Sequence, residues 1–159
     1  MREKTIKCYQ YHELGEKAKQ KARNWFLGTD EMDWAWDDMR RDAMDVGIKL
    51  TSIDERAGAK GELILDFSQV LTMILKDHGD SCETYKTAAK YKKLYDALSE
   101  EEIISIDASD VIREDFLREI LEDYRVMWSK EVEYHYSDEY VAECMEANKY
   151  DFDENGRRI

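Results

Sequence analysis

The sequence predicts an α+β protein with about five helices packed on a small, mostly antiparallel sheet. Apolar residues recur at helical spacing in several long stretches, and two short runs of alternating apolar residues follow one another between residues 48 and 67. No proline occurs in the 159 residues, so glycines and capping residues have to end the helices. This length suggests a single domain over residues 1–159.

The N-terminal third is expected to form one strand and two helices. The alternating run KTIKCYQY at residues 4–11 predicts a strand. Residues 12–27 predict a helix that ends at Gly28. Thr29 has the side chain of an N-cap, which predicts a second helix from there to about Val46, stopped by Gly47. The buried stripe of the first helix is expected at Leu14, Ala18, Ala22 and Trp25.

The middle of the chain is expected to form a hairpin followed by helices. The segment GIKLTSIDERAGAKGELILDFSQ predicts two antiparallel strands, and RAGAKG is their flexible connection. Residues 70–79 form a short apolar stretch that is a helix or a strand, and a helix is the preferred interpretation. Residues 80–102 predict a further helix. The apolar positions of the two strands are Ile48, Leu50 and Ile53, then Leu63, Leu65 and Phe67.

The C-terminal third is expected to contain the central helix of the core. A wide apolar face between residues 108 and 129 predicts that helix, with Asp107 or Ser109 as its cap. Ser137 is the expected N-cap of a last helix. In the tail, Asn155 and Gly156 predict a hairpin turn.

Acidity is the strongest compositional feature. The formal net charge is -13 and the isoelectric point is about 4.7. The acids cluster, because residues 29–47 hold seven of them against two arginines, and residues 99–123 hold ten against two. Direct nucleic-acid binding is therefore not expected, since phosphate contacts require a basic face. The acidity serves either solubility or recognition of a basic partner.

Membrane insertion and export are not expected. No run approaches the roughly 18 apolar residues of a membrane helix, and the N-terminal run MREKTIKCYQ has no apolar signal core. Cys8, Cys82 and Cys144 are scattered and odd in number, which favours free thiols in a reducing cytoplasm. We therefore expect a protein of the cytoplasm.

No catalytic motif occurs in the sequence, so we expect a protein that is not an enzyme and needs no cofactor or metal. Phosphate-binding loops, HExxH and GxSxG are all absent. The stretch DHGDSCE at residues 77–83 brings an acid, a histidine and a cysteine together. A zinc site needs four regularly spaced ligands, so a loop is the preferred interpretation, and a metal-dependent enzyme is the alternative.

The second helix has one tryptophan on each of two faces. At about 100° per residue, Met32, Ala35, Trp36, Met39, Ala43 and Val46 share a sector roughly 100° wide. Trp36 therefore belongs to the core stripe. Trp34 falls nearly opposite this stripe, on a face that also carries Asp30, Asp37, Asp38, Arg41 and Asp45.

Two interpretations of Trp34 are open. A basic segment of the same chain could cover it, either the first helix or the stretch with Lys86, Lys90, Lys92 and Lys93, through a cation–π contact. Alternatively, Trp34 is an exposed anchor for a basic partner, since tryptophan is enriched at binding hot spots. We expect two partner-binding surfaces. The first consists of Trp34, Asp37, Asp38, Arg41 and Asp45, and the second of Glu114, Asp115, Glu119, Glu122 and Asp123.

Three stretches together resemble a family of small phage-encoded proteins that is often labelled "antitoxin of a toxin–antitoxin stability system". They are ELGEKAKQKARNWF, the acidic tryptophan-containing helix that ends in GIKL, and ECMEANKYDFDENGRRI. The resemblance covers both ends of the chain, over positions 1–50 and 140–159. The family has an aromatic, glycine-rich segment of the kind WSQGDG after the second strand, whereas this chain has only DFSQ there.

The resemblance implies a phage origin and an accessory role, and with them a location in the host bacterial cytoplasm. Small acidic phage proteins of this kind bind host defence machinery, and carboxylates can stand where a complex expects phosphates. We therefore expect an anti-CRISPR-like inhibitor that binds a basic surface of a CRISPR-Cas effector complex without catalysis. The alternatives are an antitoxin that neutralises a basic toxin and a DNA-mimicking antirestriction protein. A homodimer is also open, because the wide apolar face of the 108–129 helix suits a dimer interface as well as a core.

Overall fold

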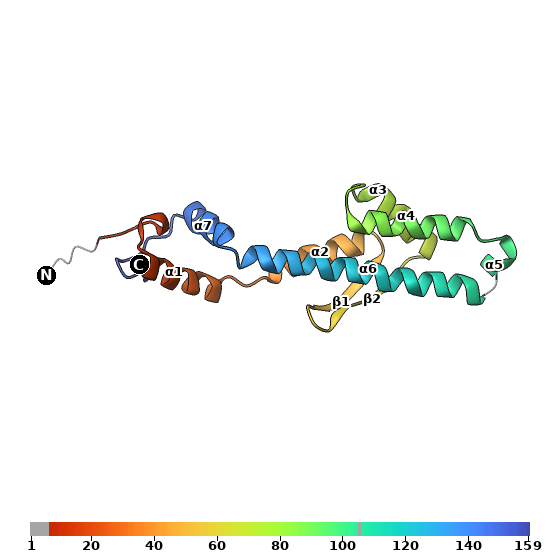
Figure 1. Cartoon of the computed structure of the whole chain (residues 1–159), viewed down its shortest axis with the longest axis horizontal. Coiled ribbons are helices and arrows are strands. Elements are labelled where there is room, and N and C mark those ends of the chain that lie inside the picture. The colour runs from red at the N-terminus through yellow and green to blue at the C-terminus, as the bar shows by residue number, and fades with distance from the viewer. Residues whose placement is uncertain (1–6, 105) are drawn as a thin grey trace. The chain divides into compact units, whose positions relative to one another are not determined.

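The computed structural model describes residues 7–104 and 106–159, and the side chains of all of these except residues 106 and 107 (Figure 1). The described part of the chain contains seven α-helices and one two-stranded antiparallel sheet, which confirms the α+β class. Contacts group the chain into two compact units. The first unit consists of Met1–Trp34 and Glu131–Ile159, and the second of Ala35–Lys130.

The first unit contains two helices, one from near each end of the chain. A single 3-10 turn, η1 (Tyr11–Glu13), precedes helix α1 (Glu16–Thr29), and α7 (Asp138–Ala147) lies close to the C-terminus. The tail folds back so that Phe152 bridges both Tyr9 and Arg158. One apolar cluster holds these segments together. Its buried members are Tyr11, Leu14, Ala18, Ala22, Phe26, Val141, Met145 and Phe152.

The prediction of a strand at residues 4–11 is wrong for residues 7–11. Residues 4–6 lie outside the described part of the chain. Tyr9 forms only an isolated bridge, because the chain then turns into η1. The backbone amide of Gln10 donates to Glu13 Oε2 at 2.7 Å. In a strand, the Gln10 amide would donate to a neighbouring strand, but here the Glu13 side chain already accepts from it. The side chains of Gln10 and Glu13 thus favour a local turn.

The boundary between the first two helices also differs from the expectation. Gly28 lies inside α1, and Thr29 is the last residue of that helix rather than the N-cap of the next. The hydroxyl of Thr29 donates to the Phe26 carbonyl oxygen at 2.9 Å, so it serves the end of α1. Helix α2 (Asp33–Asp45) begins four residues later, and Gly47 follows it with a φ of +85°.

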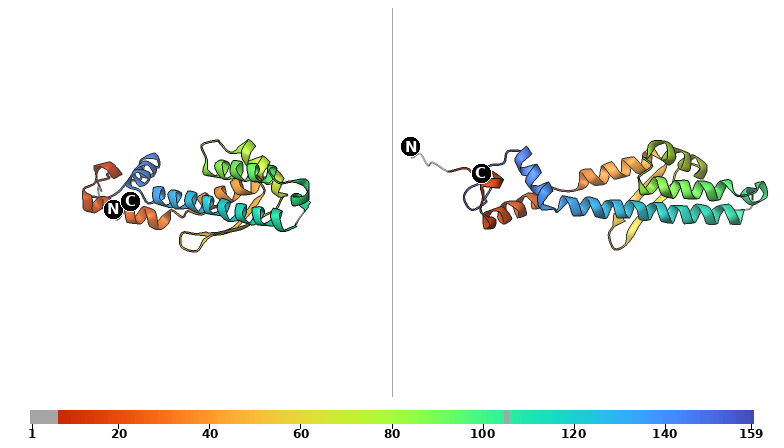
Figure 2. Two further views of the ribbon diagram at one scale, coloured as in Figure 1. Left: turned by 45° about the vertical axis from the view of Figure 1, so that its right-hand side comes forward. Right: turned by 45° about the horizontal axis from the view of Figure 1, so that its top comes forward.

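The second unit contains the larger of the two apolar cores. Most of α2 and α6 belongs to this unit, but α2 begins, and α6 ends, with residues of the first unit. The hairpin of β1 (Ile48–Asp54) and β2 (Gly58–Leu63) is followed by helices α3 (Phe67–Asp77), α4 (Glu83–Asp96), α5 (Glu100–Ile104) and α6 (Ile106–His135), as Figure 2 shows from two sides. The largest fully buried side chains of this core are Tyr124, Phe116, Ile48, Leu71, Ile74 and Ile120.

The hairpin is confirmed, but its second strand begins within the segment expected as a connection. Asp54 Oδ1 accepts hydrogen bonds from the amides of Arg56 and Ala57 at 2.8 and 2.6 Å. Such a side-chain bond to the following backbone closes the turn early. β2 therefore starts at Gly58 and pairs Leu63 with Ile48. The strand ends before Phe67, because Asp66 caps α3 by accepting from the Ser68 amide at 3.2 Å.

The C-terminal elements are longer than expected. Helix α6 continues to His135 instead of ending near Ser129. Ser109 lies inside this helix, and the side chain of the other expected cap, Asp107, lies outside the described part. Ser137 is confirmed as the N-cap of α7, since its Oγ accepts from the Tyr140 amide at 3.2 Å. None of the described helices is long and apolar enough to span a membrane.

Candidate functional site

Helix α2 has the apolar stripe that its sequence predicts. Ala35 and Ala43 are buried, and Trp36 and Met39 pack against the core of the second unit. The Trp36 ring meets the Trp128 ring edge-on, with centroids 6.0 Å apart. Trp34, the last residue of the first unit, keeps 46% of its surface exposed. Trp36 therefore lies on the core stripe as expected, and Trp34, whose exposure the sequence left open, is partly exposed to solvent.

The other predicted contact residues of α2 are all exposed. Asp37 lies 3.8 Å from Arg40, and Asp38 lies 3.1 Å from Arg41. Ion pairs that remain in water contribute little to stability. Their carboxylates are therefore free to exchange these arginines for the cations of a partner.

Three of the four lysines of α4 that were candidates to cover Trp34 pair with carboxylates of the second unit. Lys86 Nζ is 2.7 Å from Glu83 Oε1, and Lys92 Nζ is 2.8 Å from Asp96 Oδ2. Lys90 Nζ lies 2.6 Å from an oxygen of Glu119 on α6. These three cations thus already have acidic partners.

The second predicted surface divides over two sides of α6. Glu119 receives hydrogen bonds from Lys90, and Asp123 Oδ2 accepts from the Thr87 hydroxyl at 2.6 Å, so both face α4. Glu114 and Glu122 line a groove beside the hairpin instead. At roughly 100° per residue, these acids spread over about half of the helix circumference, which is too wide for one flat contact. The remaining acid, Asp115, is 2.5 Å from Arg118.

The acids that face α4 have altered proton affinities. The hydrogen bond from Lys90 lowers the pKa of Glu119 below its ordinary value. Burial raises the pKa of Asp123, and the hydrogen bond from Thr87 opposes this effect only in part. Burial and the neighbouring carboxylate of Glu119 raise the pKa of Tyr91 to about 12. This side of α6 is therefore part of the packing between two helices.

The raised pKa of Tyr91 predicts a loss of stability in alkali. An unfolded tyrosine ionises near its ordinary pKa of 10.0, whereas the folded one holds its proton to about 12. Its contribution is therefore complete below pH 10 and falls as the pH rises from 10 to 12. We expect the wild type to lose about 1 kcal/mol more than Tyr91→Phe between about pH 8 and pH 11 in urea unfolding. Equal losses in the two proteins would contradict this assignment.

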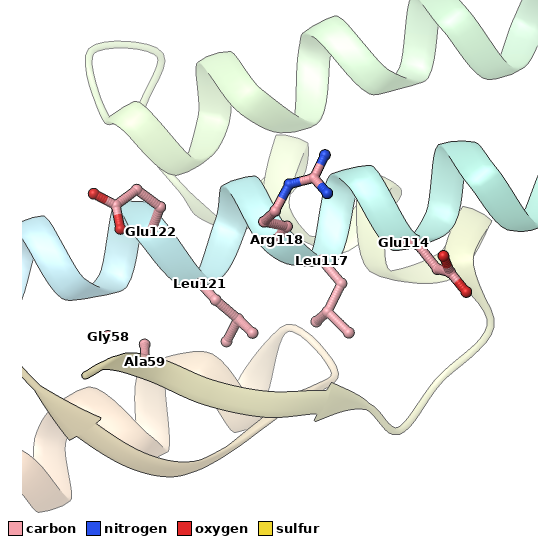
Figure 3. Close-up of a pocket in the computed structure, with 7 residues that line it drawn as sticks. All are labelled: Gly58, Ala59, Glu114, Leu117, Arg118, Leu121 and Glu122. Carbon is pink, nitrogen blue, oxygen red and sulfur yellow. The ribbon is translucent and has the colours of Figure 1, made fainter.

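An open groove of about 490 Å³ lies between α6 and the start of β2 (Figure 3). Leu117 and Leu121 point from α6 toward the strand and form its apolar floor, while the guanidinium of Arg118 points away from the strand. Glu114 stands at one end and Glu122 at the other. The lining is completed by Gly58 and Ala59 of β2.

Small residues of β2 create this groove. A Cβ atom at Gly61 would lie 3.1 Å from Leu121 Cδ2 of α6 and 2.6 Å from the Lys49 carbonyl oxygen of β1, so only glycine fits between the helix and the paired strand there. Gly58 and Ala59, which follow the turn, have too little side chain to cover the leucines. Sequence patterning assigned these residues to a loop and therefore missed the groove, although the run GAKG is a visible signal of close backbone approach.

The stretch DHGDSCE forms a junction between helices. His78 Nδ1 and Thr84 Oγ1 are 2.7 Å apart, and His78 Nε2 lies 3.7 Å from Asp42 Oδ1 of α2. Asp42 also accepts a hydrogen bond from the buried Tyr124 hydroxyl at 3.0 Å. Thr84 is only 1% exposed, so a substrate cannot reach its hydroxyl. Among the described residues, no group of three or more potential ligands gathers to hold a metal ion.

A similar polar junction lies in the first unit. The Tyr140 hydroxyl donates to Asp30 Oδ2 at 3.1 Å, and His135 Nδ1 lies 3.7 Å from the same oxygen. His135 is 2% exposed and its ring centroid is 5.0 Å from that of Tyr140. Asp30, which was expected beside Trp34 on the acidic face, is thus used to join α1 and α7.

Comparisons with known proteins return nothing that bears on this site. A scan against protein-family models finds no match, and searches of curated proteins and of solved structures find none either. The function therefore has to be argued from the exposed acidic surface, the exposed tryptophan and the groove.

Proposed function

We propose that the protein is a non-catalytic binding protein that attaches to a basic surface of a partner macromolecule. The exposed Trp34 carries this proposal, because a large apolar ring that remains in water on an acidic helix gains most from being covered. The exposed carboxylates of Asp37, Asp38 and Asp45 supply the charge that attracts a basic partner and orients it. A net charge of -13 extends that attraction beyond direct contact.

The biological role that fits this chemistry is phage anti-defence, most specifically inhibition of a CRISPR-Cas effector complex. Such complexes present lysine and arginine where nucleic acid binds, and exposed carboxylates can occupy those positions. The resemblance to phage accessory proteins supports this role. It equally supports an antitoxin that neutralises a basic toxin, and a DNA-mimicking antirestriction protein uses the same charge complementarity.

The proposal is tested with the double variant Trp34→Ala, Asp38→Lys. We expect it to bind a purified CRISPR-Cas effector complex at least tenfold more weakly in calorimetry, since truncating a hot-spot tryptophan costs about 2 kcal/mol or more. Plaque counts on CRISPR-immune bacteria that express the variant should fall in parallel. Thermal unfolding is expected to stay unchanged, because both side chains are exposed.

A matched control is available on α5. The variant Ile104→Ala, Glu101→Lys also removes one exposed apolar side chain, 80% exposed in this case, and reverses one acid. It should bind as the wild type does. The α2 surface is not the site if the Trp34 variant keeps both stability and phage protection. Rescue of cells from a basic toxin, without any effect on CRISPR immunity, would favour the antitoxin.

A further inference from the structure

The groove between α6 and β2 has the character of a binding site that the proposed α2 surface does not use. Its volume is about 490 Å³. A cavity of this size lies within the range of sites that bury a ligand. Leu117 and Leu121 are only partly buried, although they pack against the core on one side. Covering the rest of these leucines would remove apolar surface from water, which favours binding.

The charges around the groove indicate what could cover it. Arg118 is 2.5 Å from Asp115, and Glu122 is 2.6 Å from Arg125, so these four charges balance one another. Glu114 has no ion pair among the described residues and is exposed at one end of the groove. The lining therefore has one carboxylate in excess. An occupant with a cation at that end would complement it.

We infer that the groove seats a short segment of the partner protein that carries an apolar side chain with a lysine or arginine beside it. The apolar side chain lies over Leu117 and Leu121, and the cation reaches Glu114. This inference rests on the proposed function and gives it a second contact. A partner with a basic surface, as proposed above, supplies the cation, and the apolar neighbour gives the contact its position along α6.

Three peptides test this inference. They share glycine flanks and differ at the centre, which is Lys-Phe-Lys, Glu-Phe-Glu or Lys-Gly-Lys. In amide NMR titrations of the full chain, we expect Lys-Phe-Lys to shift the signals of Gly58, Ala59, Leu117 and Leu121 in a saturable way. The other two should bind at least tenfold more weakly, because each lacks either the cation or the apolar group. Equal binding of all three, no binding, or shifts confined to other residues would overturn the inference.

Variants of the chain locate the two contacts. Glu114→Lys should weaken Lys-Phe-Lys binding about tenfold. Glu133→Lys makes the same change of charge on an exposed residue of α6 that lies outside the groove, roughly 28 Å along the helix from Glu114. This distance is well beyond the screening length, so the variant should leave binding within about twofold. Ala59→Phe should abolish binding by filling the groove while both leucines stay in place. Similar effects of Glu114→Lys and Glu133→Lys would show that net charge alone matters, which would overturn the assigned position of the cation.

The groove and the proposed function can fail independently. If Ala59→Phe loses the peptide but protects phage as the wild type does, the groove is not a partner contact and the function stands. If the wild type neither protects phage nor binds an effector complex, the proposed function falls whatever the peptides do. Thermal unfolding of each variant separates loss of binding from loss of folding.

Discussion

Replacing Phe116 by alanine is expected to lower the free energy of unfolding of the second unit by about 3–5 kcal/mol. Phe116 is completely buried in the middle of α6. Its ring lies edge-on to Phe67 of α3, with centroids 5.3 Å apart, and to Tyr91 of α4, at 5.5 Å. The change removes the ring that joins three helices and leaves a cavity that rigid neighbours cannot fill.

Urea unfolding followed by circular dichroism measures this effect. The matched control is Val111→Ala, because Val111 lies on the same helix but is 57% exposed. Its effect should stay within about 0.5 kcal/mol. A Phe116→Ala loss below about 1 kcal/mol would mean that the aromatic cluster does not hold α3, α4 and α6 together.

The sequence was informative where one periodic pattern decides the structure. Helix α2 shows this best, because a period of about 3.6 residues puts Trp36 on the core stripe and Trp34 on the opposite face. The burial of Ala43 follows from that geometry, whereas the exposure of Trp34 depends on whether another segment covers that face. The Ser137 cap could also be predicted from the sequence, because Ser137 bonds to Tyr140, which lies only three residues further along in the first turn of α7.

The sequence was misleading where two local signals compete. Thr29 has the side chain of an N-cap, but its hydroxyl bonds to the end of the preceding helix. Leu63, Leu65 and Phe67 alternate as in a strand, but the Asp66 cap starts a helix between the last two. At Thr29 the bond to Phe26 outweighed the capping signal for the next helix, and at Asp66 the cap outweighed the apolar alternation.

The groove and the division of the acidic residues of α6 could not be predicted at all. Both depend on which element packs against each side of the helix, and no local pattern contains that information. Glu119 and Glu114 have the same chemistry and lie on one helix, yet α4 supplies Lys90 to the first, whereas the second stands at one end of the groove beside the hairpin. The partner-binding role of either remains a prediction.

Replacing Gly156 by alanine is expected to destabilise the first unit by about 4 kcal/mol or more. Gly156 has a φ of +78°. That backbone conformation alone costs an alanine about 1–2 kcal/mol. A Cβ atom there would also lie 2.0 Å from the carbonyl oxygen of Ala18 in α1. Since that oxygen belongs to the helix backbone, the tail has to leave α1 to make room.

Gly58 provides the control that separates the two causes. Its φ is +84°, but a Cβ atom added there meets nothing within 4 Å, so Gly58→Ala carries only the conformational cost. We expect this variant to lose about 1–2 kcal/mol. Hydrogen exchange gives the local measurement for Gly156→Ala, because the amides of Tyr9 and Phe152 bond to each other's carbonyl oxygens at 2.9 Å. Those two amides should lose their protection when the tail detaches. If Gly156→Ala and Gly58→Ala lose equal stability and both amides stay protected, the tail is not held by close contact with α1.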